Sequence, residues 1–314
     1  MLPDSNFELA YFTIRLRALS EIQMPVFQGA LFRGSFGKVF RRVVCMQNNK
    51  SCQGCSCSDK CPYAFIFESL RLKENIRWQA SHDPHPYVLE PPCFIKHNYA
   101  PGEEFSLGLV LIGEGIKYLP FFVLVFEDMG LAGIGPRRGH FEVVEVVADD
   151  LHSGLTIFCG TDQTFINDIP RIGPTALNCS NYNHERLRIC FITPVRLQQQ
   201  GKIATNVDFI MLLRALLRRY SWLSTLYCGE LPELPYGELL KTATEIKLVT
   251  SNLTWCDLER YSHRQDRYMK LGGLVGEVVF EGPLLPYLSL LKLGEYLHIG
   301  KGTAFGLGKY RCIA

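Results

Sequence analysis

Residues 283–313 read PLLPYLSLLKLGEYLHIGKGTAFGLGKYRCI, and the order of their residue types predicts the fold. The apolar run 283–297 opens with a proline, which is well tolerated at the start of a helix, so we expect a helix there. Residues 300–308 hold four glycines and predict a tight turn. Residues 306–313 then predict a closing strand.

The same order recurs in the first half of the chain. An apolar run at 117–129 predicts a buried helix, GLAGIGPRRGHF at 130–141 a second glycine-rich turn, and the alternating stretch 141–148 a strand. Each half also begins with a predicted strand, helix and two strands, at 7–19, 29–44, 87–97 and 104–112 in the first half and at 186–194, 208–227, 245–258 and 274–281 in the second. Both halves thus follow the β-α-β-β-α-β order of the ferredoxin-like unit, and the predicted fold is α+β with two such domains in tandem.

Length and composition agree with two globular domains. The 314 residues are 47% hydrophobic and 20% charged, which is ordinary for folded domains of 100 to 200 residues each. We expect an N-terminal ferredoxin-like domain at 1–150, a linker or hairpin segment at 151–184 and a C-terminal ferredoxin-like domain at 185–314.

Net charge and apolar runs limit the partners. A formal charge of +2 excludes a uniformly basic coat, so an anionic partner must bind local basic patches. The first residues lack the basic start and apolar core of a signal peptide, and apolar runs such as 119–126 are too short to cross a bilayer. We therefore expect a cytoplasmic protein that does not bind membranes.

Five of the twelve cysteines lie within residues 45–61. Their spacing, with C-x-x-C at Cys52 and Cys55, is typical of a structural zinc site with four thiolate ligands, Cys45, Cys52, Cys55 and Cys61. This Cys-rich insertion would tie down the loop after the first helix. Cys57 could replace Cys55, and unligated cysteines or a redox pair are the alternatives.

The glycine-rich loop at 300–308 is a candidate phosphate site. Glycines let backbone approach a phosphate closely, and consecutive N–H groups can bind an anion. The loop is not a Walker motif, because a strand follows it instead of a helix.

Basic residues form three further clusters, on the first helix, in the first glycine-rich turn and at 260–268. In the third cluster tyrosines alternate with arginines, which fits RNA because guanidinium groups bind phosphates while aromatic rings stack on bases. A solvated surface loop with offsetting charges is the alternative for that cluster. The candidate RNA-binding residues are Lys38, Arg41, Arg42, Arg137, Arg138, Arg196, Arg260, Tyr261, Arg264, Arg267, Gly300, Gly302, Gly306, Gly308 and Lys309.

Several motifs together resemble one family. They are GALFRGSFG at 29–37, CPYAFIFE at 61–68, PHPYVLEPP at 84–92, FITPVRL at 191–197, RYSHRQDRYMKLGGLVGEV at 260–278 and HIGKGTAFGLGKY at 298–310. The chain resembles, over nearly its whole length, the CRISPR precursor-RNA-processing endoribonucleases of the RAMP superfamily. The glycine-rich loop alone is shared by many RAMP proteins.

The resemblance implies tandem RRM-related domains that bind CRISPR repeat RNA and cut it at one position. It also implies chemistry without a metal, in which the 2′-hydroxyl attacks the scissile phosphate and leaves a 2′,3′-cyclic phosphate and a 5′-hydroxyl. A histidine on or near the first helix is frequent in the family, and residues 29–44 contain none. Catalytic roles are therefore not transferred directly.

The reaction needs a base, an acid and cations that stabilise the phosphorane. His298 directly precedes the glycine-rich loop and Lys301 follows three residues later, so we expect His298 as general acid or base with Lys301 beside it. A histidine that binds the last helix carbonyls is the alternative for His298. His263 is the second choice, and Arg33 is expected to stabilise phosphate from the first helix.

Two other functions remain open at this point. A non-catalytic RAMP subunit would bind processed guide RNA with other subunits of an interference complex. A zinc-stapled binding module would not explain the repeated β-α-β-β-α-β order. The chain could act as a monomer or a homodimer.

Overall fold

The computed structural model describes residues 6–47, 52, 54–69, 84–92, 96–149, 151, 154–177, 185–262 and 267–313. They form two compact units. We call Leu9–Arg171 with Leu226–Cys228 the N-terminal domain, and the residues before Leu9 with Ile172–Thr225 and Gly229–Ala314 the C-terminal domain. Residues 151–184, expected as a linker or hairpin segment, contain two paired strands of the N-terminal sheet up to Phe165.

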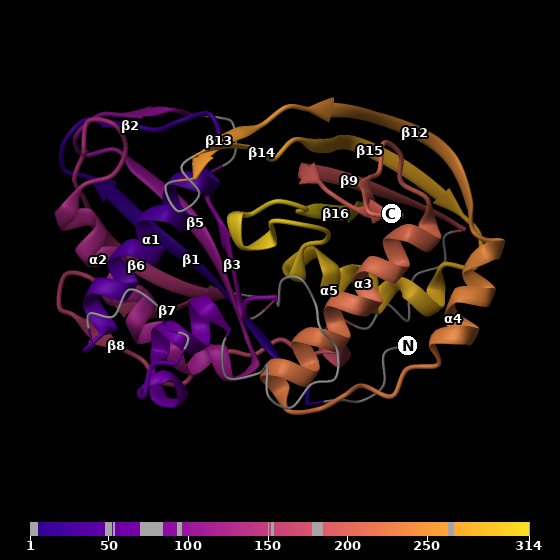
Figure 1. The fold of residues 1–314 in the computed structure, drawn as a ribbon, viewed down its shortest axis with the longest axis horizontal. Helices are drawn as coiled ribbons and strands as arrows, with labels where there is room; N and C mark the ends of the chain where they lie inside the picture. Colours follow the sequence, from indigo (N-terminus) through magenta and orange to yellow (C-terminus); the bar gives the residue numbers. More distant parts are fainter. Residues whose placement is uncertain are drawn as a thin grey trace. The chain divides into compact units, whose positions relative to one another are not determined.

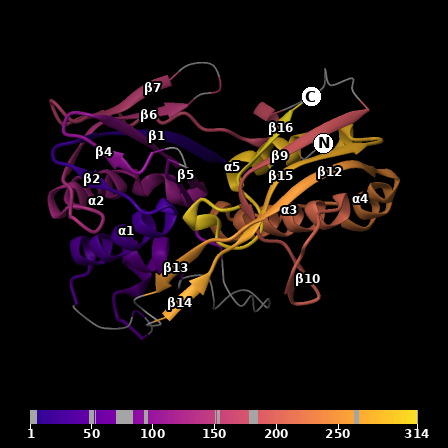
Figure 2. The same cartoon turned by 90° about the horizontal axis from the view of Figure 1, so that it is seen from above.

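The N-terminal domain is an antiparallel sheet in the order β3-β5-β1-β6-β7-β8, with α1 and α2 on one face (Figure 1, Figure 2). Its elements are β1 (Leu9–Ala18), β2 (Ile22–Gln23), α1 (Gln28–Val44), η1 (Ser58–Lys60), η2 (Ala64–Glu68), β3 (Tyr87–Glu90), β4 (Asn98–Tyr99), β5 (Glu104–Ile112), η4 (Gly113–Tyr118), α2 (Leu119–Ala132), β6 (Phe141–Asp149), β7 (Gly154–Cys159) and β8 (Thr164–Phe165).

Alternation of apolar residues explains which face of the sheet the helices cover. Phe12, Ile14 and Leu16 of the central strand β1 are fully buried, whereas Arg15, on the other face, is exposed and pairs with Glu145. The apolar side of α1 packs on α2, where the rings of Phe36 and Phe122 stack with centroids 4.8 Å apart.

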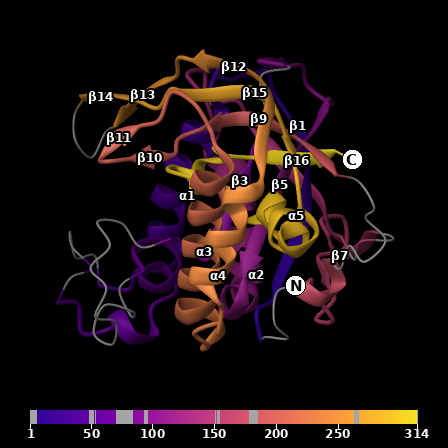
Figure 3. The same ribbon diagram turned by 90° about the vertical axis from the view of Figure 1, so that its right-hand side faces the viewer.

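The C-terminal domain has an antiparallel four-stranded sheet in the order β12-β15-β9-β16, and Figure 3 shows α3, α4 and α5 beneath it. Its elements are η5 (Pro174–Leu177), β9 (Arg186–Val195), β10 (Gln198–Gln199), β11 (Lys202–Ile203), α3 (Phe209–Leu223), η6 (Ser224–Cys228, whose last three residues belong to the N-terminal domain), α4 (Tyr236–Thr242), η7 (Ala243–Glu245), β12 (Lys247–Cys256), β13 (Glu259–Ser262), β14 (Arg267–Lys270), β15 (Gly273–Glu281), η8 (Leu285–Tyr287), α5 (Leu288–Leu297), η9 (Thr303–Phe305) and β16 (Tyr310–Ile313).

Both sheets have the same core topology. In each, the first strand of the β-α-β-β-α-β series, β1 or β9, lies between the third and fourth, and the second lies outside the third. The mixed α and β architecture with two ferredoxin-like sheets is therefore as predicted. The ribbon β13–β14 continues outward from β12 and β15 (Figure 2). Among the described residues, no helix is long and apolar enough to span a membrane.

Candidate functional site

The glycine-rich loop of the C-terminal domain connects α5 to β16 and is tied to the end of β9. Lys301 N–H donates to Arg196 O at 3.1 Å, and Gly308 N–H donates to Pro194 O at 3.1 Å. Gly308 has φ +75°, and a Cβ on it would lie 1.8 Å from Ile299 O, so only glycine fits there. The loop thus has a fixed shape set by backbone contacts.

The predicted catalytic residue His298 lies inside this loop. Its side chain is fully buried, and its Nδ1 lies 3.1 Å from Leu307 O, across the loop. The buried Arg219 donates from Nε to Leu297 O at 2.7 Å, which fixes the helix end just before His298. In this conformation His298 braces the loop, and its ring would reach an RNA only if the loop opened.

Lys301 is the cation that the loop exposes. Several backbone N–H groups of the loop donate within the domain, among them those of Gly306 to Thr303 O at 2.8 Å and Lys309 to Thr193 Oγ1 at 2.8 Å. These amides are engaged and cannot also bind a phosphate. The loop therefore offers an anion the exposed side chain of Lys301 more readily than these amides.

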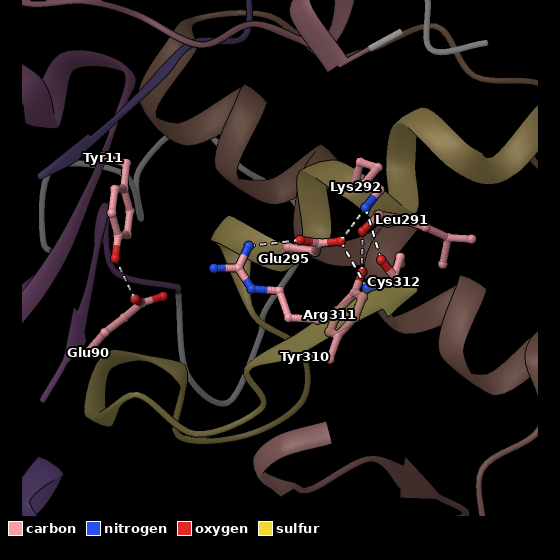
Figure 4. A network of polar contacts seen from close by, with 8 residues as sticks. All are labelled: Tyr11, Glu90, Leu291, Lys292, Glu295, Tyr310, Arg311 and Cys312. Carbon is pink, nitrogen blue, oxygen red and sulfur yellow. Dashed lines mark hydrogen bonds and ion pairs between the residues drawn. The ribbon is translucent and has the colours of Figure 1, made fainter. Parts of the chain in front are cut away.

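A buried carboxylate holds both ends of the loop, as Figure 4 shows. Glu295 on α5 is only 7% exposed and accepts from Lys292 Nζ at 3.0 Å and from Arg311 Nη1 at 3.0 Å. Its Oε1 also accepts from the backbone N–H of Cys312 on β16 at 2.9 Å. Charge-assisted hydrogen bonds of this kind are strong when one partner is buried. Because α5 precedes the loop and β16 follows it, the network sets the distance between the loop's ends.

The ribbon β13–β14 is attached to the same loop by two predicted RNA-binding arginines. Arg196 Nη1 donates to Gly272 O at 2.8 Å and to Lys270 O at 3.2 Å, and burial lowers the pKa of Arg196. The guanidinium carbon of Arg260 lies 4.5 Å from the centroid of the Phe305 ring. These two arginines have a structural role in joining the ribbon to the loop.

The tip of the ribbon is only partly described. His263 and Arg264 lie outside the described residues, and Tyr261 and Arg267 have described backbone only. Tyr268, which the sequence analysis did not select, is 73% exposed on the ribbon. Exposed aromatic rings beside cations are suited to base stacking. The alternation of tyrosines with arginines at 260–268 was the sequence signal that could have selected Tyr268.

In the N-terminal domain, Arg33 of α1 is held between two rings. Its guanidinium carbon lies 4.6 Å from the centroid of Phe67, and its Nη2 lies 3.0 Å from His85 Nε2. His85 Nδ1 in turn lies 3.2 Å from Ser69 Oγ, and Tyr227 Oη lies 3.1 Å from that oxygen. The sequence predicted Arg33 but not its partners Phe67 and His85, which lie 34 and 52 residues further along the chain.

The other basic residues selected from the N-terminal domain have varied surroundings. Arg42 pairs with Asp128 at 2.8 Å and Arg137 with Glu21 at 3.2 Å, so part of their charge is offset at the surface. The guanidinium carbon of Arg41 lies 5.8 Å from the centroid of the Tyr63 ring. Lys38 and Arg138 are exposed. Their binding of RNA stays a prediction.

The five clustered cysteines are all described and half-buried. Burial is the main cause that raises the pKa of the Cys52 thiol, and the nearby Glu68 raises it further. Cys61 and Cys45 have smaller effects in the same direction. Among the described residues, no three His, Cys, Asp or Glu side chains are grouped so that they could hold a metal ion. In this arrangement the cysteines do not form the tetrahedral zinc site that their spacing predicts, and the site stays a prediction.

Comparisons with known proteins link the two domains to families. Residues 7–169, more than half of the chain, match the AF_1859_N family of N-terminal domains, and residues 189–310 match the CRISPR-associated endoribonuclease Cas6 family. An uncharacterised protein of Archaeoglobus fulgidus is 26% identical over 294 residues, which is 93% of each chain.

Solved structures share the fold. A Cas6 product complex is 14% identical over 97% of this chain and 99% of the other, with a TM-score of 0.57. The Thermus thermophilus Cas6 is 14% identical over 98% of this chain and 99% of its own, also with 0.57. A partial Cas6–RT–Cas1–Cas2 complex is 12% identical over 99% of this chain and 47% of that chain, again with 0.57. The C-terminal domain is similar to the CRISPR-associated endoribonuclease Cas6 family, and the chain belongs to the family that its N-terminal domain matches.

Proposed function

We propose that the protein is an endoribonuclease that binds CRISPR repeat RNA and cuts precursor guide RNA once within each repeat. The observation that supports this most is the Cas6 match over residues 189–310, the part of the chain that contains the whole glycine-rich loop and its exposed Lys301. Two structures of similar fold are a Cas6 product complex and a Cas6 substrate-mimic complex.

The proposed reaction needs no metal. A base takes the proton of the 2′-hydroxyl, whose oxygen attacks the adjacent phosphorus. The bond from phosphorus to the 5′-oxygen breaks, and an acid gives that oxygen a proton. The products are a 2′,3′-cyclic phosphate and a 5′-hydroxyl. Lys301 and Arg33 are the proposed cations for the charge on the phosphorane, since fixed cations stabilise charge that develops in the transition state.

His298 and His263 are the proposed proton-transfer groups. For His298, the variants His298→Ala and His298→Gln separate chemistry from bracing of the loop. A lost acid or base lowers the cleavage rate about 10²- to 10⁴-fold in both variants while the RNA affinity stays the same. A bracing role instead lowers the melting temperature and the RNA affinity of the alanine variant, because the buried contact to Leu307 O is lost.

The cleavage assay uses a labelled repeat RNA from the source genome in excess EDTA. The substrate is compared with a series that carries one 2′-deoxy nucleotide at each candidate position. We expect a single cut that persists in EDTA and is blocked by one 2′-deoxy position. Cleavage that stops in EDTA, or that no single 2′-deoxy position blocks, would contradict the proposed chemistry.

A binding subunit of an interference complex is the second candidate function. The buried position of His298 favours it, because a loop that braces itself with its histidine could bind RNA without cutting it. Tight binding of the repeat RNA with no cut in the same assay would select this function. The proposal also includes other subunits of an interference complex as partners, and a monomeric or homodimeric state. The mass of the purified protein, measured with and without RNA, distinguishes the monomer from the homodimer.

A structural zinc ion on the thiolates of Cys45, Cys52, Cys55 and Cys61 also belongs to the proposal, with Cys57 as the alternative to Cys55. The support is the spacing of these cysteines, with C-x-x-C at Cys52 and Cys55. Metal analysis of the purified protein is expected to give about one zinc per chain by the four-ligand rule, and less in Cys52→Ser and Cys61→Ser. Equal metal content in wild type and both variants would refute this site.

A further inference from the structure

The hydrogen bonds around His85 have one consistent direction. A guanidinium can only donate, so Arg33 Nη2–H donates to His85 Nε2 across 3.0 Å and that nitrogen carries no proton. The imidazole is then neutral with its proton on Nδ1, which donates to Ser69 Oγ across 3.2 Å. His85 therefore acts here as an acceptor for a cation and not as a proton donor at Nε2.

The chain continues to the backbone. Tyr227 Oη lies 2.8 Å from Pro84 O and 3.1 Å from Ser69 Oγ. Tyr227 Oη donates its single proton to one of these two oxygens, and in either case Ser69 Oγ stays an acceptor for His85 Nδ1. Each contact from Arg33 to Ser69 Oγ thus has a defined donor and acceptor, which fixes the orientation of the imidazole.

The backbone at Ser69 is unusual in a way that serves this arrangement. Ser69 follows the π-helical turn η2 and has φ +53°, in the left-handed region that non-glycine residues rarely adopt. Its side chain is only 2% exposed. Strained backbone and π-helical turns occur often at functional sites, where the surrounding structure must hold them. Here the strain orients the Ser69 hydroxyl toward His85.

Arg33 is restrained on a second side by Phe67, whose ring centroid lies 4.6 Å from the guanidinium carbon. Arg33 and His85 are both half-buried. A half-buried guanidinium with one edge on an imidazole and one face on a ring loses less freedom when it binds a phosphate, which strengthens that binding. The same cation on a freely moving side chain would bind a phosphate more weakly.

From these contacts we propose that His85 is a positioning residue, which with Ser69 and Tyr227 orients the Arg33 guanidinium for a phosphate of the bound RNA. This inference rests on the proposed function and deepens it, because it assigns His85 a role through Arg33 and not a proton transfer of its own.

The test uses four variants and two RNAs. His85→Gln keeps an oxygen acceptor near the position of Nε2, whereas His85→Asn keeps only a group near Nδ1, so the first retains the Arg33 contact and the second loses it. Arg33→Ala removes the cation. His140→Gln changes an exposed histidine of the same domain and is the control. Single-turnover cleavage is measured on the repeat RNA, and affinity on the same RNA with a 2′-deoxy group at the cut.

We expect His85→Asn and Arg33→Ala to weaken binding of the 2′-deoxy RNA about tenfold, as for loss of one charge-assisted hydrogen bond, and to slow cleavage about 10- to 100-fold. His85→Gln and His140→Gln stay within about threefold of wild type, below what loss of such a bond costs. Melting temperatures show that all four variants are folded. If wild type fails to cut, the proposed endonuclease function is refuted, and the affinities still decide the positioning role.

An equal loss of cleavage rate in His85→Gln and His85→Asn would overturn the proposal in favour of direct proton transfer by His85. Wild-type affinity in His85→Asn, with weakened Arg33→Ala, would overturn it as well.

Discussion

Two glycines on one helix give a matched test of how α1 packs. Gly34 is exposed, and a Cβ on it would meet nothing within 4 Å, whereas a Cβ on Gly37 would lie 2.2 Å from Cζ of Phe67. Both lie inside α1, so replacing either by alanine gains the same helix propensity, about 1 kcal/mol. The two variants therefore differ in whether the Phe67 ring is displaced.

The cost at Gly37 can be estimated from the contacts of that ring. Phe67 stacks on Tyr63 with centroids 5.1 Å apart, worth about 1 kcal/mol, and lies under the guanidinium of Arg33, worth about 0.5–1 kcal/mol. Because the nearest atom is the outer end of a half-buried ring, the ring can turn away and give up these contacts. We expect Gly37→Ala to be about 2 kcal/mol less stable than Gly34→Ala, by the sum of these contacts.

Urea unfolding, followed by circular dichroism and read at the midpoint, measures this difference. Gly34→Ala should raise the midpoint above wild type, and Gly37→Ala should lower it or leave it unchanged. Repeat-RNA cleavage should follow the same order, since the displaced ring no longer restrains Arg33. An equal rise of the midpoint in both variants would show that Phe67 does not pack on α1, and the reasoning about Arg33 would fail with it.

Three further predictions concern the C-terminal domain. Gly201 has φ +82° and open space around it, so Gly201→Ala should cost only the left-handed strain of about 1–2 kcal/mol. A Cβ on Gly308 would lie 1.8 Å from Ile299 O, so Gly308→Ala should lower the melting temperature much further and weaken RNA binding. Similar melting temperatures of the two variants would contradict the loop geometry. Glu295→Gln should reduce stability by about 1–3 kcal/mol, as for lost hydrogen bonds to a charged group, and an unchanged urea midpoint would contradict that network. Burial raises the pKa of Tyr310 well above its usual value, so the native state keeps this proton to a higher pH than the unfolded state. The stability of wild type should therefore fall as the pH rises above about 10, and that of Tyr310→Phe should fall less steeply. Equal slopes of stability against pH in the two proteins would refute this.

The sequence predicted the order of elements because apolar periodicity reports burial directly. The first helix was expected from 29 and begins at Gln28, and the strand at 104–112 matches β5. The largest shifts occur where backbone chemistry overrides periodicity. The strand expected over 87–97 ends at Glu90, since Pro91 and Pro92 have no N–H to pair with a neighbouring strand. The closing strand begins at Tyr310, because Gly306 and Gly308 have positive φ and belong to the loop.

The candidate site was less predictable, because a residue type shows the available chemistry but not its surroundings. His298 was chosen for its position before a glycine-rich loop. Its burial and its contact with Leu307 O come from the folded shape of that loop, which the sequence pattern does not show. Arg42 carries a full charge in the sequence, and its partner Asp128 lies 86 residues away. His85, between prolines, gave no signal, since its role depends on Arg33 and Ser69 from two other elements.

The most direct test of the account is end-group analysis of repeat RNA incubated with the purified protein. The RNA is labelled at either end, and the fragments are treated with acid, which opens cyclic phosphates, and with a kinase, which labels 5′-hydroxyls. We predict one cut per repeat, with a 2′,3′-cyclic phosphate upstream and a 5′-hydroxyl downstream. Fragments with a 5′-phosphate and a 3′-hydroxyl would contradict it, because attack by the 2′-hydroxyl cannot produce them.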